Sequence, residues 1–311
     1  MADASPPLLL IMGPTAAGKT ELALQVAERL DGEIISVDSA MVYRGMDIGT
    51  AKPSATERAR VAHHLIDILP PHESYSAARF RADAMRAIDA VRASGRLPVL
   101  VGGTMLYFAA LQRGLSWLPG ADAGLREQIA WRARELGWAA LHRELAAVDP
   151  AAAQRIHPND PQRIQRALEV WQLTGVPLSE HHRADPQSQR GLRTVKIVLS
   201  PPQREQLHER IAQRFDAMLE AGLVDEVAAL RDDPRLTVDT PAMRAVGYRQ
   251  VWNYLAGDWS YGKMRERAII SSRQLAKRQL TWLRRESDAR WFGSAGAESE
   301  RIDDFIDAAV A

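Results

Sequence analysis

The chain has 311 residues, 46% hydrophobic and 25% charged, and no cysteine, which excludes a disulfide framework, a thiolate zinc site and a cysteine nucleophile. Its net charge is only +1, so any affinity for nucleic acid must come from a local excess of positive charge. The first residues lack a targeting pattern and no apolar run approaches the ~18 residues of a membrane helix. We therefore expect a cytoplasmic protein with no membrane partner.

The first predicted elements are a strand, a phosphate-binding loop and a helix. Five apolar residues at 8–12 precede GPTAAGKT at 13–20, which matches the P-loop pattern G-x-x-x-x-G-K-[ST] at every fixed position. Loop N–H groups and the helix N-terminus suit a diphosphate, Lys19 adds a positive charge, and the Thr20 hydroxyl suits Mg²⁺. The predicted diphosphate-binding residues are Gly13, Pro14, Thr15, Ala16, Ala17, Gly18, Lys19 and Thr20.

A second strand is predicted at 32–37, and Asp38 follows its carboxyl end. Ligands of parallel sheets bind outside these ends, so Asp38 and the P-loop should open onto the same crevice. A carboxylate there can accept a proton or a hydrogen bond from a nucleophile, although Asp38 would equally suit a helix cap or a turn. The irregular stretch from Ser39 to Pro53 is typical of a substrate loop.

Residues 63–101 are expected to have structural roles, and the next candidate site residues follow a third buried strand. The adjacent histidines at 63–64 point apart in an extended chain, so we expect no metal site there. A helix is predicted at 74–92 and a strand at 97–101, followed by Gly102, Gly103 and Thr104. Hydrolytic P-loop proteins usually place an acidic residue at such a point. The two glycines would instead permit close approach of a ligand with Thr104 as donor, although a plain turn remains an alternative.

Residues 115–190 interrupt this alternation of strands and helices. They are rich in Ala, Arg, Glu and Trp with helical spacing, which indicates a helical subdomain inserted into an α/β core. Arg163 and Arg166 share one helix face, where they could contact a nucleic-acid backbone or simply form a solvated surface. We expect residues 1–114 and 191–311 to form the core and residues 115–190 to form the subdomain.

The last third combines a returning strand with a basic helical region. A strand is predicted at 194–199, and helices are predicted at 205–219 and 224–230. The helix at 205–219 places Arg210 and Arg214 on one face, where they could form a second clamp for phosphate oxygens. Residues 244–290 contain 11 Lys or Arg and 4 Asp or Glu. Two stretches there mix cations with aromatic residues, which suits phosphate contacts and base stacking but also an ordinary amphipathic helix. A terminal helix should follow residue 293.

Together these patterns predict an α/β fold: a P-loop NTPase-like core with a parallel sheet flanked by helices, plus an inserted all-helical subdomain. The stretches also resemble the bacterial tRNA dimethylallyltransferase family, in order, over about 285 residues. The blocks that carry the resemblance are GPTAAGKT (13–20), ISVDSAMVYRGMDIGTAKP (35–53), HHLIDIL (63–69), VGGTMLYF (101–108), NDPQRIQRALEV (159–170), RAVGYRQ (244–250) and KRQLTWLR (277–284).

The resemblance implies a Mg²⁺-dependent prenyltransferase of EC class 2.5. Such an enzyme moves a dimethylallyl group from dimethylallyl diphosphate to N6 of the adenosine on the 3′ side of the anticodon, in tRNAs that read codons beginning with uridine. By similarity Asp38 is the general base, Lys19 and Thr20 complete the catalytic set, and Arg214 helps to hold the diphosphate. Many relatives carry Gln where this chain has Met41, so a side-chain amide contact is lost there.

The resemblance further implies that the tRNA anticodon stem-loop is the partner of the inserted subdomain and of the basic C-terminal region, and that the protein is a monomer. The residues matched to family positions that touch tRNA are Asp38, Ser39, Ala40, Met41, Thr104, Arg126, Gln162, Arg163, Ile164, Gln165, Arg166, Arg244, Ala245, Val246, Gly247, Tyr248, Arg249, Lys277, Arg278, Gln279, Leu280, Thr281, Trp282, Leu283 and Arg284.

Three alternatives remain open from the sequence. A nucleotide or nucleoside kinase would use the same strand, P-loop and helix. Prenylation of free AMP or ADP would need the same donor site, although the arginine-bearing insert argues against it. A non-enzymatic RNA-binding module would show salt-dependent RNA binding that does not depend on diphosphate.

Overall fold

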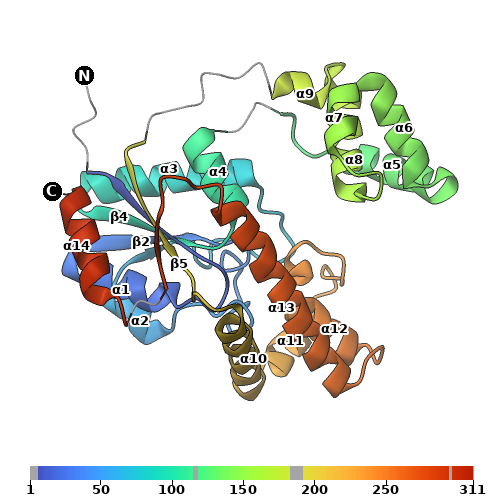
Figure 1. The fold of residues 1–311 in the computed structure, drawn as a ribbon. Coiled ribbons are helices and arrows are strands. Elements are labelled where there is room, and N and C mark those ends of the chain that lie inside the picture. The colour runs from blue at the N-terminus through green and yellow to red at the C-terminus, as the bar shows by residue number, and fades with distance from the viewer. Residues whose placement is uncertain (1–5, 115–117, 183–191, 294–295, 311) are drawn as a thin grey trace. The chain divides into compact units, whose positions relative to one another are not determined.

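The computed structural model describes residues 6–114, 118–182, 192–293 and 296–310. The chain divides into two compact units, here called unit 1 (Met1–Leu111 with Gly191–Ala311) and unit 2 (Gln112–Arg190). Figure 1 shows the sheet with its helices in unit 1 and a group of helices in unit 2. Among the described residues, no helix is both long enough and apolar enough to cross a membrane.

The centre of unit 1 is a parallel sheet with the strand order β3-β2-β4-β1-β5-β6. The first strand lies in the middle, where Leu9 is opposite Val99 of one neighbour and Val195 of the other. Helices cover both faces, so the inner strands are almost continuously apolar. The strands are β1 (Leu8–Met12), β2 (Gly32–Val37), β3 (His63–His64), β4 (Leu97–Gly102), β5 (Thr194–Leu199) and β6 (Arg290–Phe292).

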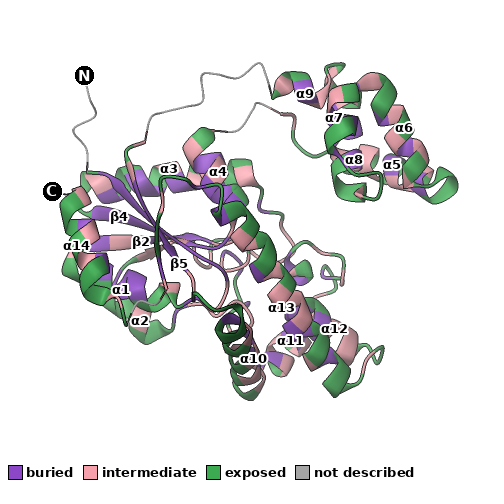
Figure 2. Ribbon diagram, in the orientation of Figure 1, coloured by how far each residue is buried: buried purple, intermediate pink, exposed green. Residues whose placement is uncertain are grey.

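Some helices of unit 1 cover the two faces of the sheet as two layers, and the helices between β5 and β6 form a group beside it (Figure 1). The helices of unit 1 are α1 (Lys19–Arg29), α2 (Ala55–Arg60), α3 (Ala77–Ala93), α4 (Met105–Arg113), α10 (Arg204–Glu220), α11 (Leu223–Arg231), the 3₁₀ helix η1 (Ala242–Arg244), α12 (Tyr248–Leu255), α13 (Tyr261–Leu283) and α14 (Ser299–Val310). Alternate residues of β1 point to opposite faces: Leu9 and Ile11 pack with α1 and α14, whereas Leu8 and Leu10 pack with α3, α4 and the later helices. Figure 2 shows the sheet buried between these layers.

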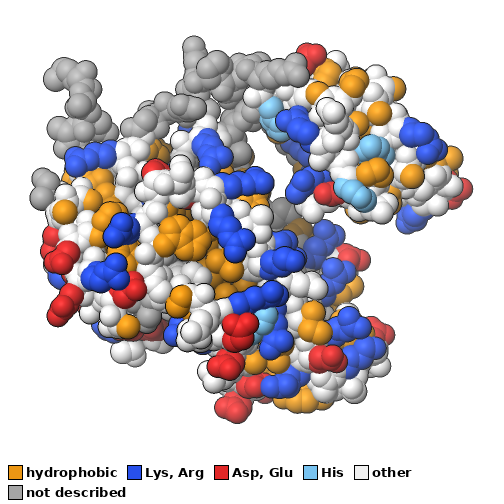
Figure 3. Space-filling view, in the orientation of Figure 1, with side chains coloured by type: hydrophobic (Ala, Val, Ile, Leu, Met, Phe, Trp, Pro, Cys, Tyr) orange, Lys and Arg blue, Asp and Glu red, His pale blue; other side chains and the backbone are white. Residues whose placement is uncertain are grey.

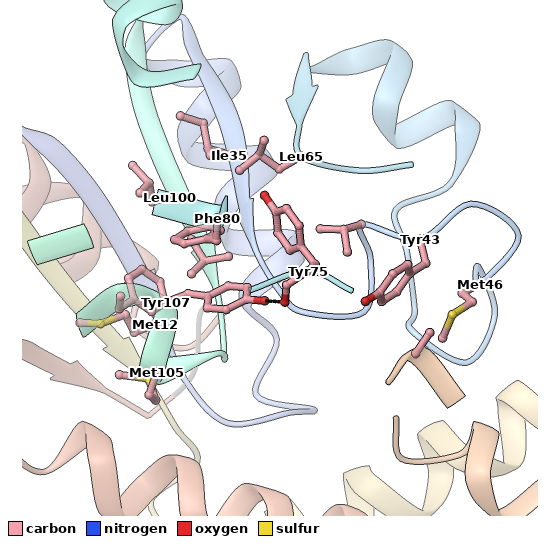
Figure 4. Close-up of a cluster of buried hydrophobic side chains, with 14 of the residues drawn as sticks. Met12, Ile35, Tyr43, Met46, Leu65, Tyr75, Phe80, Leu100, Met105 and Tyr107 are labelled. Carbon is pink, nitrogen blue, oxygen red and sulfur yellow. Dashed lines mark hydrogen bonds between the residues drawn. The ribbon is translucent and has the colours of Figure 1, made fainter. Parts of the chain in front are cut away.

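An aromatic cluster fixes the chain where β4 passes into α4. The ring of Tyr107 stacks on Phe80 with centroids 4.4 Å apart and meets the edge of Tyr75 at 6.1 Å. The Tyr107 hydroxyl donates to the Tyr75 carbonyl oxygen at 3.1 Å, as drawn in Figure 4. These side chains are buried, so the start of α4, directly after Thr104, is held firmly.

Unit 2 is a small all-helical unit with its own apolar core. Its buried side chains include Ile129, Leu141 and Leu168. Asp122, Asp149 and Asp160 each accept a backbone N–H at a helix start, which explains where three of the helices begin. Its helices are α5 (Ala123–Leu136), α6 (Trp138–Val148), α7 (Pro150–Arg155), α8 (Pro161–Thr174) and α9 (Leu178–His181).

The predicted α/β fold class is confirmed. The tandem histidines, for which we expect a structural role, contact other groups of the protein, and His63 also faces the cavity described below. They form β3, where His64 Nε2 lies 2.6 Å from Glu33 Oε2 and His63 Nδ1 lies 2.7 Å from the Val61 carbonyl oxygen. The terminal helix predicted after residue 293 is α14. The prediction missed β6, because a three-residue edge strand with two exposed residues carries no periodic signal.

Candidate active site

The P-loop predicted from the sequence connects the central strand to α1. A Cβ on Gly13 would lie 2.3 Å from the carbonyl oxygen of Leu199 in the neighbouring strand, so no side chain fits there. Gly18, directly before α1, has φ of +92°, which L side chains rarely adopt. Both glycines of the motif are therefore required by this backbone.

A cavity of about 540 Å³ opens at the carboxyl ends of β1, β2 and β4, and all the residues that line it belong to unit 1. The P-loop from Thr15 onward, the segment after β2, part of the loop at 49–53 and the end of β4 line it, together with one face each of α10 and α13 and the end of η1. The predicted site residues that line it are Thr15, Ala16, Lys19, Thr20, Asp38, Ser39, Ala40, Met41, Thr104, Arg214, Arg244, Ala245, Val246, Arg278, Gln279 and Trp282.

Lys19 and Arg214 lie in this cavity without a carboxylate at ion-pair distance among the described residues. Lys19 Nζ donates to the carbonyl oxygen of Pro14 at 2.7 Å, within its own loop. Burial and the nearby charge of Arg214 lower the pKa of Lys19 to about 7, whereas Asp38 opposes this shift. Burial also lowers the pKa of Arg214, and Asp38 again opposes the shift. Two positive charges held close together in a partly dry cavity favour the binding of an anion.

Asp38 is held in one orientation by the backbone that follows it. Its Oδ1 atom accepts the N–H groups of Ala40 at 2.8 Å and Met41 at 3.2 Å. The turn that the sequence left as an alternative to catalysis is therefore present, and the same carboxylate also lines the cavity. Because the turn occupies one oxygen, the carboxylate keeps its second oxygen for a ligand.

Met41 lines the cavity, but its side chain carries no amide group. Its Sδ atom lies 3.7 Å from the hydroxyl of Ser36, a weak hydrogen bond within the protein. Packing is the contribution of this side chain to the site.

Gly102 and Gly103 at the end of β4 both line the cavity, and close ligand approach at these glycines stays a prediction. A Cβ on Gly102 would lie 2.1 Å from the carbonyl oxygen of Val37, and one on Gly103 would lie 2.4 Å from the side chain of Gln279. Protein atoms thus fill the space on the side where a side chain of either residue would project, so both positions require glycine. Thr104 Oγ1 accepts the N–H of Ser39 at 3.2 Å, so this hydroxyl joins the ends of β2 and β4.

Gln279 of α13 joins the P-loop to the end of β4. Its Oε1 atom accepts the N–H of Thr15 at 2.9 Å, and its Nε2 atom donates to the carbonyl oxygen of Gly103, also at 2.9 Å. The sequence placed Gln279 only among tRNA contacts. No local pattern reveals this link, because 264 residues separate Gln279 from Thr15.

The basic C-terminal region presents only part of the predicted set to the surface. Arg249, Lys277, Thr281 and Arg284 are exposed, and Figure 3 shows Lys and Arg side chains gathered along the face that carries α13. Gly247, Tyr248 and Leu283 are buried and Leu280 packs against the core. The Tyr248 and Leu283 side chains therefore belong to the packing of α12 and α13, which corrects the expectation that they contact RNA. For Gly247 and the half-buried Leu280 this contact stays a prediction.

The predicted RNA contacts of unit 2 are also divided. Arg126 and Arg166 both bind the carboxylate of Glu169, which is fully buried, with Arg126 Nε at 2.8 Å and Arg166 Nη1 at 2.6 Å. Ile164 is buried in the core of the unit, which corrects its assignment as a contact. Gln165 is half-buried and donates to the Arg126 carbonyl oxygen at 2.9 Å, whereas Gln162 and Arg163 are exposed.

Helix α10 also corrects one prediction and adds a feature that the sequence did not reveal. Arg214 lines the cavity but Arg210 is exposed and does not, so only one arginine of the predicted clamp is present. Ile211, Phe215 and Met218 of the same helix form an apolar wall of the cavity.

The described residues contain no group of three His, Cys, Asp or Glu side chains that could hold a metal ion. Thr20 nevertheless lines the cavity beside Lys19, the position expected for a hydroxyl that binds Mg²⁺. Mg²⁺ keeps several waters and is often bound by one or two protein groups together with substrate phosphates. This donor set therefore fits a magnesium ion that arrives with a diphosphate.

The fold and this cavity define an α/β protein of the P-loop type with a basic helical region beside the phosphate loop. Residues 41–286 match the family model described as IPP transferase. A tRNA dimethylallyltransferase of Alkalilimnicola ehrlichii is 62% identical over 282 residues, covering 91% of this chain and 89% of its own. The chain therefore belongs to the IPP transferase family.

Solved structures agree with this assignment. The tRNA isopentenylpyrophosphate transferase of Bacillus halodurans superposes with a TM-score of 0.71 at 39% identity, covering 98% of this chain and 97% of that one. A eukaryotic dimethylallyltransferase acting on tRNA gives a TM-score of 0.82 at 26% identity, covering 98% of this chain and 80% of that one.

Proposed function

We propose that this protein transfers a dimethylallyl group from dimethylallyl diphosphate to N6 of the adenosine on the 3′ side of the anticodon, and releases diphosphate. The observation that carries the proposal is the composition of one cavity. The P-loop with Lys19, Arg214 and the apolar wall of α10, the oriented carboxylate of Asp38 and the basic helix α13 all line it. A diphosphate, a nucleophile, a short hydrocarbon and an RNA each have a matching surface there.

The donor would bind with its diphosphate on the P-loop and its five-carbon chain toward Ile211, Phe215 and Met218. Breaking the allylic C–O bond leaves negative charge on the diphosphate, which Lys19 and Arg214 stabilise. Mg²⁺ held by Thr20 would supply further charge neutralisation on the departing diphosphate. The apolar wall excludes water from the allyl carbon, on which positive charge develops.

The acceptor would enter with its exocyclic amine beside Asp38. The adenine N6 attacks the allyl carbon as the C–O bond breaks, and its proton passes to the second carboxylate oxygen. An adenine amine is a poor nucleophile, so orientation contributes more than deprotonation before attack. The base must first leave the stack of the anticodon loop, and Arg278 and Trp282 offer a cationic and an aromatic surface to compensate.

A kinase is not favoured by this geometry. Phosphoryl transfer in P-loop proteins uses a further carboxylate for Mg²⁺ or water near the phosphates. Asp38 is the only carboxylate among the described residues that line the cavity, and β4 ends in glycines. The apolar wall of α10 also has no use in phosphoryl transfer.

The test is nucleoside mass analysis after the protein has been incubated with Mg²⁺, dimethylallyl diphosphate and an unmodified phenylalanine tRNA transcript. We expect a five-carbon adduct confined to the adenosine beside the anticodon. Asp38→Ala should retain diphosphate binding but lose about 100-fold or more in rate, the lower range for general-base removal. No adduct from folded protein that binds diphosphate would refute the proposal.

A further inference from the structure

We propose that Glu226 of α11 is a positioning residue that holds the pocket-lining loop, residues 46–53, in its active shape. The kinetic part of this inference rests on the proposed transfer reaction, whereas its structural part does not. Glu226 does not line the cavity itself. Its effect on the reaction would therefore pass through the backbone that it binds.

The carboxylate of Glu226 accepts three consecutive N–H groups of this loop. Oε2 accepts from Asp47 at 2.8 Å and Ile48 at 2.7 Å, and Oε1 accepts from Gly49 at 3.1 Å. Consecutive backbone amides that converge on one anion form a strong site, because each bond is charge-assisted. The loop has turn bonds of its own, from the N–H groups of Ala51 and Lys52 to the carbonyl oxygens of Ile48 and Asp47, but the N–H groups of residues 47–49 all bind a side chain about 178 positions away.

Tyr248 completes the arrangement from a second helix. Its hydroxyl donates to Glu226 Oε1 at 2.5 Å, and burial followed by this bond strongly raises the pKa of the phenol. Its ring lies directly against Gly49, where a Cβ would be 2.5 Å from a ring carbon. Glu226 therefore fixes the direction of the loop N–H groups, and the Tyr248 ring fixes the position of the loop at Gly49.

The two ends of this connection belong to different walls of the cavity. Gly49, Thr50 and Pro53 of the loop line it, and so do Arg244 to Val246, just before Tyr248. The Glu226–Tyr248 bond thus sets the spacing between the loop and the segment from which the basic region begins. A displacement of about 1 Å at a reacting group can lower a rate by about 100-fold, so this spacing affects catalysis.

Other anchors hold the remainder of the loop and leave a defined task to Glu226. Met46 is fully buried in the hydrophobic cluster of Figure 4. The buried ammonium of Lys52 donates to the Tyr43 carbonyl oxygen at 2.9 Å and binds Asp47 at 2.5 Å and Asp67 at 2.6 Å. Loss of Glu226 should therefore loosen residues 47–49 without unfolding the loop as a whole.

The experiment compares Glu226→Gln with Asp225→Asn. Asp225 is a neighbouring exposed carboxylate on the same helix, and its substitution removes the same charge. The side-chain amide of the Glu226→Gln variant has only one acceptor oxygen. Its NH₂ group must therefore face at least one loop N–H or the Tyr248 hydroxyl, which in the wild type donate to a carboxylate oxygen. We expect amide hydrogen exchange at residues 47–49 to accelerate at least tenfold. With both substrates saturating, kcat should fall about tenfold, while the Kd for inorganic diphosphate changes less than twofold. Asp225→Asn should match the wild type in all three.

The possible outcomes separate positioning from simple stability. Unchanged exchange and an unchanged kcat in Glu226→Gln would overturn the proposal, as would an equal loss in Asp225→Asn. If Glu226→Gln does not fold, Tyr248→Phe takes its place, with a smaller but parallel change expected in exchange and kcat; no change in that folded variant would also overturn it. If the wild type shows no transfer at all, the proposed function fails, and the exchange result alone decides the structural part.

Discussion

The cations of the P-loop cavity and the arginines of unit 2 are both predicted to contact substrate, yet their surroundings differ. Lys19 and Arg214 have no carboxylate at ion-pair distance among the described residues, and burial lowers the pKa of each. Arg126 and Arg166 both bind the buried Glu169. A desolvated cation without a protein anion favours a ligand anion, whereas Arg126 and Arg166 compensate the buried charge of Glu169, which would be costly to leave unpaired. Substitutions in the cavity should therefore affect catalysis, whereas substitutions at Glu169 should affect stability.

Lys19→Ala should produce the largest loss in the cavity. Without this charge the diphosphate leaving group loses a direct stabilising contact, which is worth about 10³-fold in kcat by analogy with a removed oxyanion donor. Steady-state kinetics of transfer to the tRNA transcript measures it. The melting temperature should stay within a few degrees of the wild type, and a rate reduced less than tenfold would contradict the assignment of Lys19.

Glu169→Ala should instead affect stability in unit 2. Removal of one partner of a buried ion pair costs about 3 kcal/mol, near the lower end of the usual range because the two arginines are partly exposed and can be hydrated. Amide hydrogen exchange of α5 and α8 measures this loss, and the Kd of unit 1 for diphosphate should not change. Glu127→Ala, an exposed residue of α5, is the control; an equal loss there would refute the role of Glu169.

Arg214→Ala and Arg210→Ala compare two arginines one helical turn apart on α10. Arg214 lines the cavity, so its removal should lower kcat/KM for the diphosphate donor about 100-fold. Arg210 is exposed and lies outside the cavity, so its removal should change this value less than twofold. Equal effects of the two substitutions would mean that both arginines contact the donor.

The pH dependence of diphosphate binding should reveal the charge state of Lys19. Its pKa is about 7 in the unliganded protein, and a bound diphosphate must raise it. Lys19 therefore takes up a proton on binding above pH 7, and its contribution to affinity falls by up to tenfold per pH unit there, whereas below pH 7 it is already charged.

Titration calorimetry with inorganic diphosphate in buffers of different ionisation enthalpy measures this proton uptake. Lys19→Arg stays charged at all pH values tested, so it should lose the proton uptake that Lys19 contributes, while the protonation of the ligand itself stays the same. An equal number of protons taken up by both proteins would exclude Lys19 as their source.

The sequence by itself determined the elements whose signals are local. Five apolar residues, GPTAAGKT and an apolar-periodic run define the strand, P-loop and α1, because turn conformation and helix periodicity depend on neighbouring residues. The same holds for β2, β4 and β5, for the helices of the insert and for the position of Asp38 at a strand end. The sequence stretches that resemble the tRNA dimethylallyltransferase family further indicated which reaction to expect at Asp38.

Only the tertiary structure decided which side chains share the cavity. It brought Gln279 to Thr15 and Glu226 to the loop at residues 47–49, contacts that span most of the chain. It also separated Arg214 from Arg210, which share a helix face in the sequence pattern. The physical reason is that burial and pairing depend on which distant elements pack together, and no periodicity within one segment records that choice.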